Sequence, residues 1–306
     1  MEYGFEPNES VEAGVKRIAS EQIRLAIDEA NDTSIDRHEA VHRIRKRCKK
    51  QRALIRLVRP SLAETFERDN AFFRDLSRNL STLRDAQALL ECFDRTLDHF
   101  KATIDRSRFT TLRRFLTNQR DEYAGDQATL VQRTKMCAEQ LEKAFSFVEE
   151  WSIPSDDFTS FASGLEKTYR RAGKAMRQIQ KHPATEQLHE WRKRVKYHGY
   201  HAKLLGYIAP DLLAPHRELA EQLGTRLGED HDLAVLGSSL FSPGSSAAIN
   251  DPCLPEFRTL IQTRQLQLQS DAIQLGGILL AEKPRHLIRR WQQYWRVERD
   301  SRAETN

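Results

Sequence analysis

Apolar residues recur every three or four positions along most of this chain, and polar residues fill the positions between them. That spacing is typical of helices that bury one face, because an α-helix turns once in about 3.6 residues. Gly and Pro are sparse, and the long stretches between them are rich in Leu, Ala, Arg, Lys, Glu and Gln, which favour helix. The pattern predicts an all-α protein with helices over residues 9–31, 36–58, 61–81, 84–103, 105–124, 127–150, 158–181, 185–208, 210–227, 229–240, 255–280 and 283–298.

The helix predicted over residues 36–58 has clear end signals and a clear packing side. Asp36 and Glu39 form a capping box at its start, and Pro60 stops it. Its packing stripe is Val41, Ile44, Cys48, Gln51, Ile55 and Val58. The helix over residues 185–208 carries the equivalent stripe Leu188, Trp191, Val195, His198, Ala202 and Leu205. Both helices are therefore expected to be buried along one side.

These two helices belong to a sequence repeat. VHRIRKRCKKQRALIRLVRP, residues 41–60, and LHEWRKRVKYHGYHAKLLGYIAP, residues 188–210, share the pattern H-x-x-R-K-R-x-K at an offset of 147 residues. Downstream, NLSTLRDAQALL at 79–90 corresponds loosely to RLGEDHDLAVL at 226–236. Two matched segments in the same order indicate an internal duplication.

The repeat divides the chain into two halves of similar length. The segment SIPSDDF at 152–158 separates them, and residues 237–257 form the one long predicted loop. We therefore expect two helical bundles related by approximate internal symmetry, over residues 1–151 and 152–306.

The charge of the chain is unevenly distributed. The formal net charge is +5, yet residues 37–59 hold ten Lys or Arg against one Glu, and residues 165–203 hold eleven against three acidic residues. The remaining residues must then carry a net negative charge. Such segregation indicates a local anionic partner rather than a generally basic protein.

The cations form rows along three predicted helices, at positions that share one helix face. The rows are His42, Arg45, Lys49, Arg52 and Arg56; His189, Arg192, Lys196, Gly199 and Lys203; and Lys167, Arg170, Lys174, Arg177 and Lys181. Solvated helix faces would explain any single row. None of the rows contains a carboxylate, however, and burying unpaired cations in a dry core costs several kcal/mol each. The pattern therefore favours a wet, concave basic groove for an extended polyanion.

Nucleic acid and inorganic polyphosphate are the two obvious polyanions. Proteins that bind single strands interleave aromatic residues with the cations for base stacking. The first basic helix has no aromatic residue between 37 and 60, and in the second Trp191 lies on the packing stripe, which leaves Tyr197 and Tyr200. A ligand of phosphate without bases fits better.

The duplicated H-x-x-R helix, followed each time by an RD-like helix start, resembles the CHAD family, the conserved histidine α-helical domain. The resemblance spans roughly residues 9–298. It implies two pseudo-symmetric bundles of the four-helix type that enclose a central basic cavity, and binding of inorganic polyphosphate rather than catalysis. We expect no cofactor and no metal. The ligand-facing residues that it implies are His42, Arg45, Lys49, Arg52, His189, Arg192, Lys196, Lys167, Arg170, Arg171, Lys174 and Arg177. The rows and the repeated motif add Lys46, Arg56, Lys193 and Lys203 as candidates.

The sequence departs from the family pattern at three positions. Gln87 stands where the first copy often has an acid, Glu229 replaces the arginine of an RD pair, and Gly199 interrupts the second row. These departures bear on individual contacts more than on the fold.

A nucleic-acid-binding protein that uses the same basic groove remains an alternative, and so do two catalytic hypotheses. In one, His42 or His189 would be a transient phospho-acceptor in a phosphate-transferring or hydrolysing enzyme. In the other, Asp85 and Asp230 would be catalytic acids, although helix N-caps explain them without chemistry. No G-x-x-x-x-G-K loop is present, and a metal at the histidines would meet repelling Arg and Lys neighbours.

Cysteine usage and hydropathy bear on the compartment. Cys48, Cys92, Cys137 and Cys253 lie far apart and form no CxxC pair, so we expect free thiols. The N-terminal residues show no signal pattern, and the longest apolar run, near residues 275–281, is too short to span a bilayer. We expect a cytoplasmic protein without membrane contact, associated with polyphosphate granules.

Overall fold

The computed structural model describes residues 3–80, 85–124, 127–181, 184–241 and 251–303. Within these ranges the chain is helical and contains no strand, which confirms the all-α prediction. The α-helices are α1 (Val11–Asn31), α2 (Arg37–Leu57), α3 (Phe66–Asn79), α4 (Asp85–His99), α5 (Thr110–Ala124), α6 (Gln127–Glu150), α7 (Thr159–Lys181), α8 (Thr185–Leu204), α9 (Pro210–Phe241), α10 (Leu254–Leu279) and α11 (Pro284–Ala303). Two short 3₁₀ helices, η1 (Arg106–Phe109) and η2 (Gly206–Ile208), precede α5 and α9.

Most predicted helices agree with the observed ones to within a few residues, and one prediction is wrong. The ranges 210–227 and 229–240 are a single helix, α9, with Gly228 in its interior. Glycine weakens an isolated helix, but α9 packs along α8, and this tertiary contact outweighs the local propensity.

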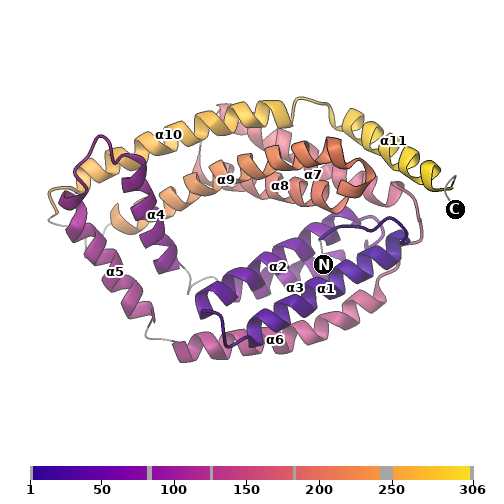
Figure 1. Cartoon of the computed structure of the whole chain (residues 1–306), viewed down its shortest axis with the longest axis horizontal. Helices are drawn as coiled ribbons and strands as arrows, with labels where there is room; N and C mark the ends of the chain where they lie inside the picture. Colours follow the sequence, from indigo (N-terminus) through magenta and orange to yellow (C-terminus); the bar gives the residue numbers. More distant parts are fainter. Residues whose placement is uncertain (1–2, 81–84, 125–126, 182–183, 242–250, 304–306) are drawn as a thin grey trace.

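The helices form two layers (Figure 1). In one layer α1 packs against α2 and α6, and α2 packs against α3; in the other, α8 packs against α7 and α9, and α9 against α10. The pair α4 and α5 closes one end, where α4 contacts α9 and α10 (Figure 1). At the other end α2 packs directly against α7 and α8. The two layers are thus in direct contact where α2 meets α7 and α8, whereas α4 contacts the second layer, through α9 and α10.

The apolar cores cross the boundary predicted at residue 151. Phe93 of α4 and Phe109 of η1 pack on Phe257 of α10, with ring centroids 4.7 and 5.8 Å apart from it. A larger cluster joins Ile44 of α2 with Trp291 of α11. The helices α1 and α2 recur as α7 and α8 at nearly the offset of the sequence repeat. The duplication and the two-bundle division stay predictions.

The packing stripes behave as predicted. The residues of both stripes in α2 and α8 are buried, with at most 5% of each side chain exposed. Asp36 caps α2 by accepting hydrogen bonds from the backbone N–H groups of His38 and Glu39. All four cysteines are free and buried. No described helix combines the length and the apolar character needed to cross a membrane.

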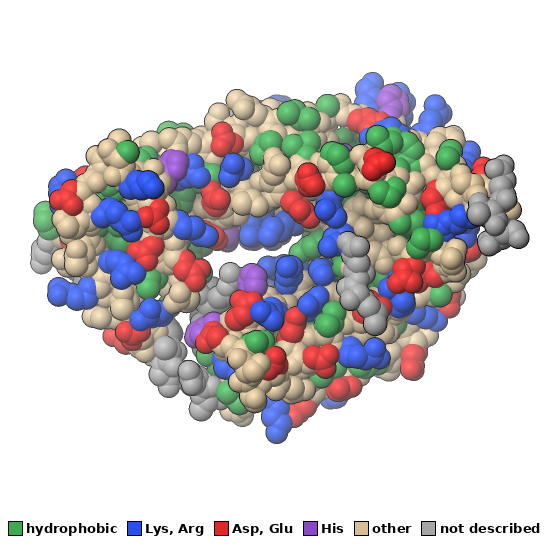
Figure 2. Space-filling model, viewed as in Figure 1, with side chains coloured by type: hydrophobic (Ala, Val, Ile, Leu, Met, Phe, Trp, Pro, Cys, Tyr) green, Lys and Arg blue, Asp and Glu red, His purple; other side chains and the backbone are tan. Residues whose placement is uncertain are grey.

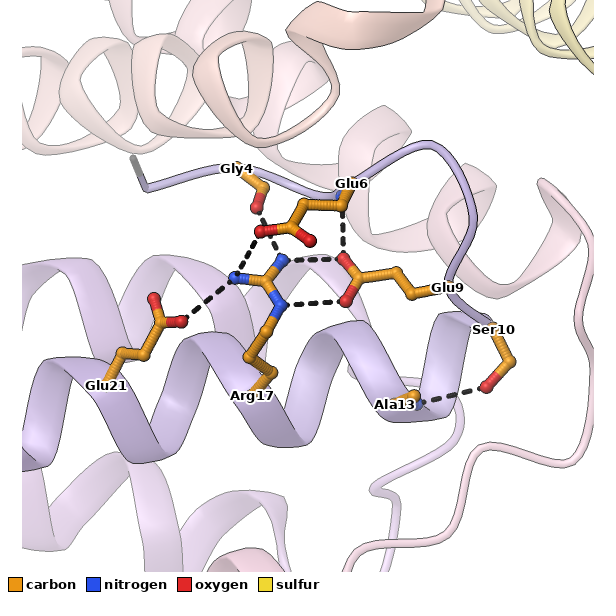
Figure 3. Close-up of polar contacts among 7 residues, drawn as sticks. All are labelled: Gly4, Glu6, Glu9, Ser10, Ala13, Arg17 and Glu21. Atoms are coloured by element: carbon orange, nitrogen blue, oxygen red, sulfur yellow. Dashed lines mark hydrogen bonds and ion pairs between the residues drawn. The ribbon is translucent and has the colours of Figure 1, made fainter. Parts of the chain in front are cut away.

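An N-terminal segment, residues 3–10, runs over the C-terminal end of α8. The N–H of Phe5 donates to the carbonyl of Leu204 at 3.0 Å. Arg17 of α1 holds this segment, because its guanidinium donates to both carboxylate oxygens of Glu9, at 2.6 and 2.8 Å, and to the carbonyl of Gly4 at 2.9 Å (Figure 3). These bonds raise the pKa of Arg17 above its usual value. The segment is therefore an ordered part of the fold.

Candidate functional site

A cavity of about 580 Å³ lies between α2 and α8 and extends to α3, α4 and α9. Figure 2 shows the hollow near the middle of the molecule, with Lys and Arg side chains along its rim. Its described lining residues include eleven Lys or Arg and three carboxylates. The cations and histidines of the lining are His42, Arg45, Lys49, Arg52, Arg56, Arg74, Arg78, Arg95, His189, Arg192, Lys193, Arg194, Lys196 and His231.

The structure brings together many of the candidate residues and leaves others outside. All five members of the α2 row line the cavity, and α8 contributes His189, Arg192, Lys193 and Lys196. Lys46 instead lines a separate hollow of about 250 Å³ that also contains Glu29 and Glu39. Among the described residues, the cavity lining does not include Lys203, Lys167, Arg170, Arg171, Lys174 or Arg177.

Two cations of α7, Arg171 and Lys167, lie near cations of other helices. Burial lowers the pKa of Arg171, and the charges of Arg194 and Arg56 add to this effect. Burial and the charge of Arg59 likewise lower the pKa of Lys167. Since Arg194 and Arg56 line the cavity, Arg171 extends its positive surface onto α7.

Two glycines of α9 make room for the α8 cations. A Cβ atom at Gly228 would lie 3.3 Å from Nε of Arg192, and one at Gly224 would lie 3.5 Å from Cγ of Lys196. Because neither glycine has a side chain, Arg192 and Lys196 can lie along the surface of α9 as they extend into the cavity.

His189 faces a second imidazole. Its ring centroid lies 4.4 Å from that of His231 in α9. Burial, followed by the charges of His231 and Lys193, lowers the pKa of His189 to about 4. His189 is therefore neutral at pH 7 in the protein without ligand, and a bound anion would raise its pKa.

Sequence reasoning missed several lining residues, among them Arg74 and Arg78 of α3 and Arg95 of α4. Arg74 pairs with Asp75, and Arg95 pairs with Asp232 of α9 at 3.3 Å. These arginines form no row on their own helices. Their shared feature is that they lie on the neighbours of the basic helices, which only the tertiary structure shows.

The prediction that Asp230 caps a helix is wrong, because α9 continues through it. Asp230 is buried, its carboxylate accepts a hydrogen bond from Gln269 of α10 at 2.8 Å, and burial raises its pKa. It therefore joins α9 to α10. Asp85 is the first residue of α4, and its side chain lies outside the described residues. In the described part of the chain, no group of three His, Cys, Asp or Glu side chains is placed to hold a metal ion.

A comparison with known families identifies the family of this chain. The family model of the CHAD domain matches residues 17–240, which include both basic helices and the whole of the described cavity lining. The chain belongs to the CHAD family. No curated protein matches this chain.

Proposed function

We propose that this protein binds inorganic polyphosphate in the cavity between α2 and α8 and performs no chemistry on it. The main support for this proposal is the composition of the cavity lining. Cations from α2, α3, α4 and α8 line the cavity together and outnumber its carboxylates. Such a surface attracts a polyanion and gains charge-assisted hydrogen bonds and counterion release when the polyanion binds.

The aromatic residues of the cavity support a ligand without bases. The described aromatic lining consists of Tyr197 and Tyr200 besides the histidines. The Arg56 guanidinium lies 4.7 Å from the centroid of Tyr197, and Tyr200 packs edge-on against Tyr3 at 5.9 Å. Both rings are thus engaged within the protein, whereas proteins that bind single strands present aromatic faces to bases.

The carboxylates of the lining support binding rather than catalysis. Glu190 pairs with Lys193 at 2.6 Å and with Arg194 at 3.0 Å, and Asp232 pairs with Arg95. Enzymes that transfer phosphate usually use carboxylates to hold Mg²⁺. Here two of the three carboxylates hold the cations in place instead.

Titration calorimetry with long-chain polyphosphate at several salt concentrations tests the proposal. We expect tight binding that weakens steeply with salt, and a loss of more than about 100-fold in the charge-reversal variant Arg45→Glu/Arg192→Glu. The matched control is Arg114→Glu/Arg296→Glu, which changes the net charge equally at two exposed residues outside the cavity lining. Unchanged affinity in the first variant, with helicity intact, would refute the proposal.

The same samples test the two alternatives, an enzyme that uses a histidine and a nucleic-acid-binding protein. Release of orthophosphate, or a phosphohistidine at His42 or His189, after incubation with polyphosphate and Mg²⁺ would establish an enzyme. Displacement of polyphosphate by single-stranded DNA at matched charge and salt would establish a general anion groove.

A further inference from the structure

Tyr197 of α8 lies in the cavity wall, against two arginines of α2. The Arg56 and Arg52 guanidinium carbons lie 4.7 and 5.9 Å from the centroid of the Tyr197 ring. Tyr197 is only 7% exposed, so its ring is fixed by the surrounding protein. One side chain of the second basic helix therefore organises two cations of the first.

The other contacts of these arginines are neutral. Nε of Arg52 donates to Oδ1 of Asn70 in α3 at 3.2 Å, and Arg56 also lies 5.9 Å from the ring centroid of Phe66. In the described ranges, no carboxylate lies within 4.0 Å of either guanidinium. Burial lowers the pKa of Arg52, and the nearby positive charge of Arg56 adds to this effect. The two cations are thus held near each other without a direct ion pair to a described carboxylate.

An aromatic ring is suited to hold such a pair. The negative face of the ring attracts a guanidinium but leaves its positive charge unneutralised, whereas a carboxylate would compete with the ligand for the guanidinium. A free arginine side chain loses about 2 kcal/mol of rotamer entropy when it is fixed, and an arginine that is already ordered loses less on binding. A nucleobase could stack on Tyr197 at this position only by displacing Arg56.

We propose that Tyr197 is a positioning and specificity residue. It holds Arg52 and Arg56 ready for phosphates of an unbranched chain, and it denies its ring to bases. The inference rests on the polyphosphate-binding function proposed above and adds to it the reason for discrimination against nucleic acid.

The test compares Tyr197→Leu with Tyr197→Phe, since the second variant keeps the ring. We expect Tyr197→Leu to weaken polyphosphate binding about tenfold and Tyr197→Phe to bind like the original protein. The ratio of DNA to polyphosphate dissociation constants should fall in Tyr197→Leu alone. The matched control is Tyr207→Leu, which removes a half-buried ring outside the cavity and should leave both constants unchanged.

A double-variant cycle with Arg56→Gln separates positioning from a general structural role. If Tyr197 acts through Arg56, Tyr197→Leu should lower the polyphosphate affinity of the Arg56→Gln protein by less than about threefold. Full additivity, or an unchanged polyphosphate affinity in Tyr197→Leu, would overturn the inference while leaving the proposed function intact. Failure of the unsubstituted protein to bind polyphosphate would instead refute the proposed function.

Discussion

The two basic helices, α2 and α8, carry the same motif but contribute differently to the cavity. The α2 row lines the cavity along its full length, as far as Arg56, whereas the α8 row stops at Lys196. At the tenth position after the histidine, Arg52 bonds to Asn70 of α3, while Gly199 is buried with its Cβ position 3.4 Å from Ala220 of α9. The same row lines the cavity only where the neighbouring helix leaves space for long side chains.

The two helices also end differently. The last carbonyls of α2 are crossed by α7 at Gly164, where a Cβ atom would lie 2.1 Å from the carbonyl oxygen of Leu57. The last carbonyls of α8 are covered by the N-terminal segment, through the bond from Phe5 to Leu204. The C-terminal end of α2 is therefore covered by a closely crossing helix, and that of α8 by a segment that side chains hold in place.

The largest effect is expected from Gly164→Ala. The added methyl group would collide with backbone atoms that cannot rotate away, so α7 must separate from α2, at a cost of about 3 kcal/mol or more in unfolding free energy. Urea denaturation measures this loss. Gly173→Ala on the same helix is the control, since its Cβ would meet only the end of the Arg177 side chain, at 3.4 Å, and should be neutral or stabilising. Equal stabilities of the two variants would show that the crossing has room to adjust.

Acid should destabilise the contact between α8 and α2 at His201. His201 of α8 is fully buried, its Nε2 lies 3.0 Å from the carbonyl oxygen of Ala53 in α2, and burial lowers its pKa to about 4. The unfolded chain binds the proton first, near pH 6.5, so the contribution of His201 is complete above that pH and is lost as the pH falls toward 4. The full loss is about 3 kcal/mol.

Urea unfolding between pH 7.5 and 4.5 measures this dependence. His201→Gln should have a flatter profile than the original protein, although it is less stable at pH 7.5. His286→Gln, at an exposed histidine of α11, should keep the original slope. If the slopes of all three proteins agree, the acid sensitivity resides elsewhere.

The difference between the two helices also marks the limit of sequence reasoning. The packing stripes could be predicted, because apolar spacing within one helix identifies its buried side. The α2 row lines the cavity, whereas Lys203 of α8 lies outside the described lining. Burial lowers the pKa of Lys50, and the charges of Arg47 and Lys203 add to this effect. A row specifies a face of its own helix, and the neighbouring helices decide what that face meets.

The same limit explains the break that was predicted in α9. Gly228 and the polar residues after it indicate a helix end when only local propensity is considered. In the structure Gly228 lies against Arg192 of α8, and Asp230 bonds to Gln269 of α10. Both residues serve contacts between helices that are distant in sequence, and a single sequence gives no signal for them.

A smaller effect is expected from Arg17→Ala, which releases the segment over the end of α8. The variant would leave the carboxylates of Glu9 and Glu21, which are 13% and 10% exposed, without their shared partner, at a cost of about 2 kcal/mol. Hydrogen exchange at the Phe5 amide should become faster, and urea denaturation gives the overall loss. Lys16→Ala removes a half-buried surface pair with Glu12 and should cost less than about 0.5 kcal/mol. Unchanged protection of Phe5 would show that the segment is held by its apolar contacts alone.

The smallest effect is expected from Gly228→Ala, which probes how α9 accommodates the α8 row. Alanine favours helix over glycine by about 1 kcal/mol, so the variant should be slightly more stable. Its methyl group, however, would lie 3.3 Å from Nε of Arg192 and push this side chain from its position, so polyphosphate affinity should fall a few-fold. Gly237→Ala, on the same helix and outside the cavity lining, should gain stability without loss of affinity. Higher stability with lower affinity in Gly228→Ala alone would show that glycine at position 228 leaves room for Arg192. The same changes in both variants would show that Arg192 does not need this room.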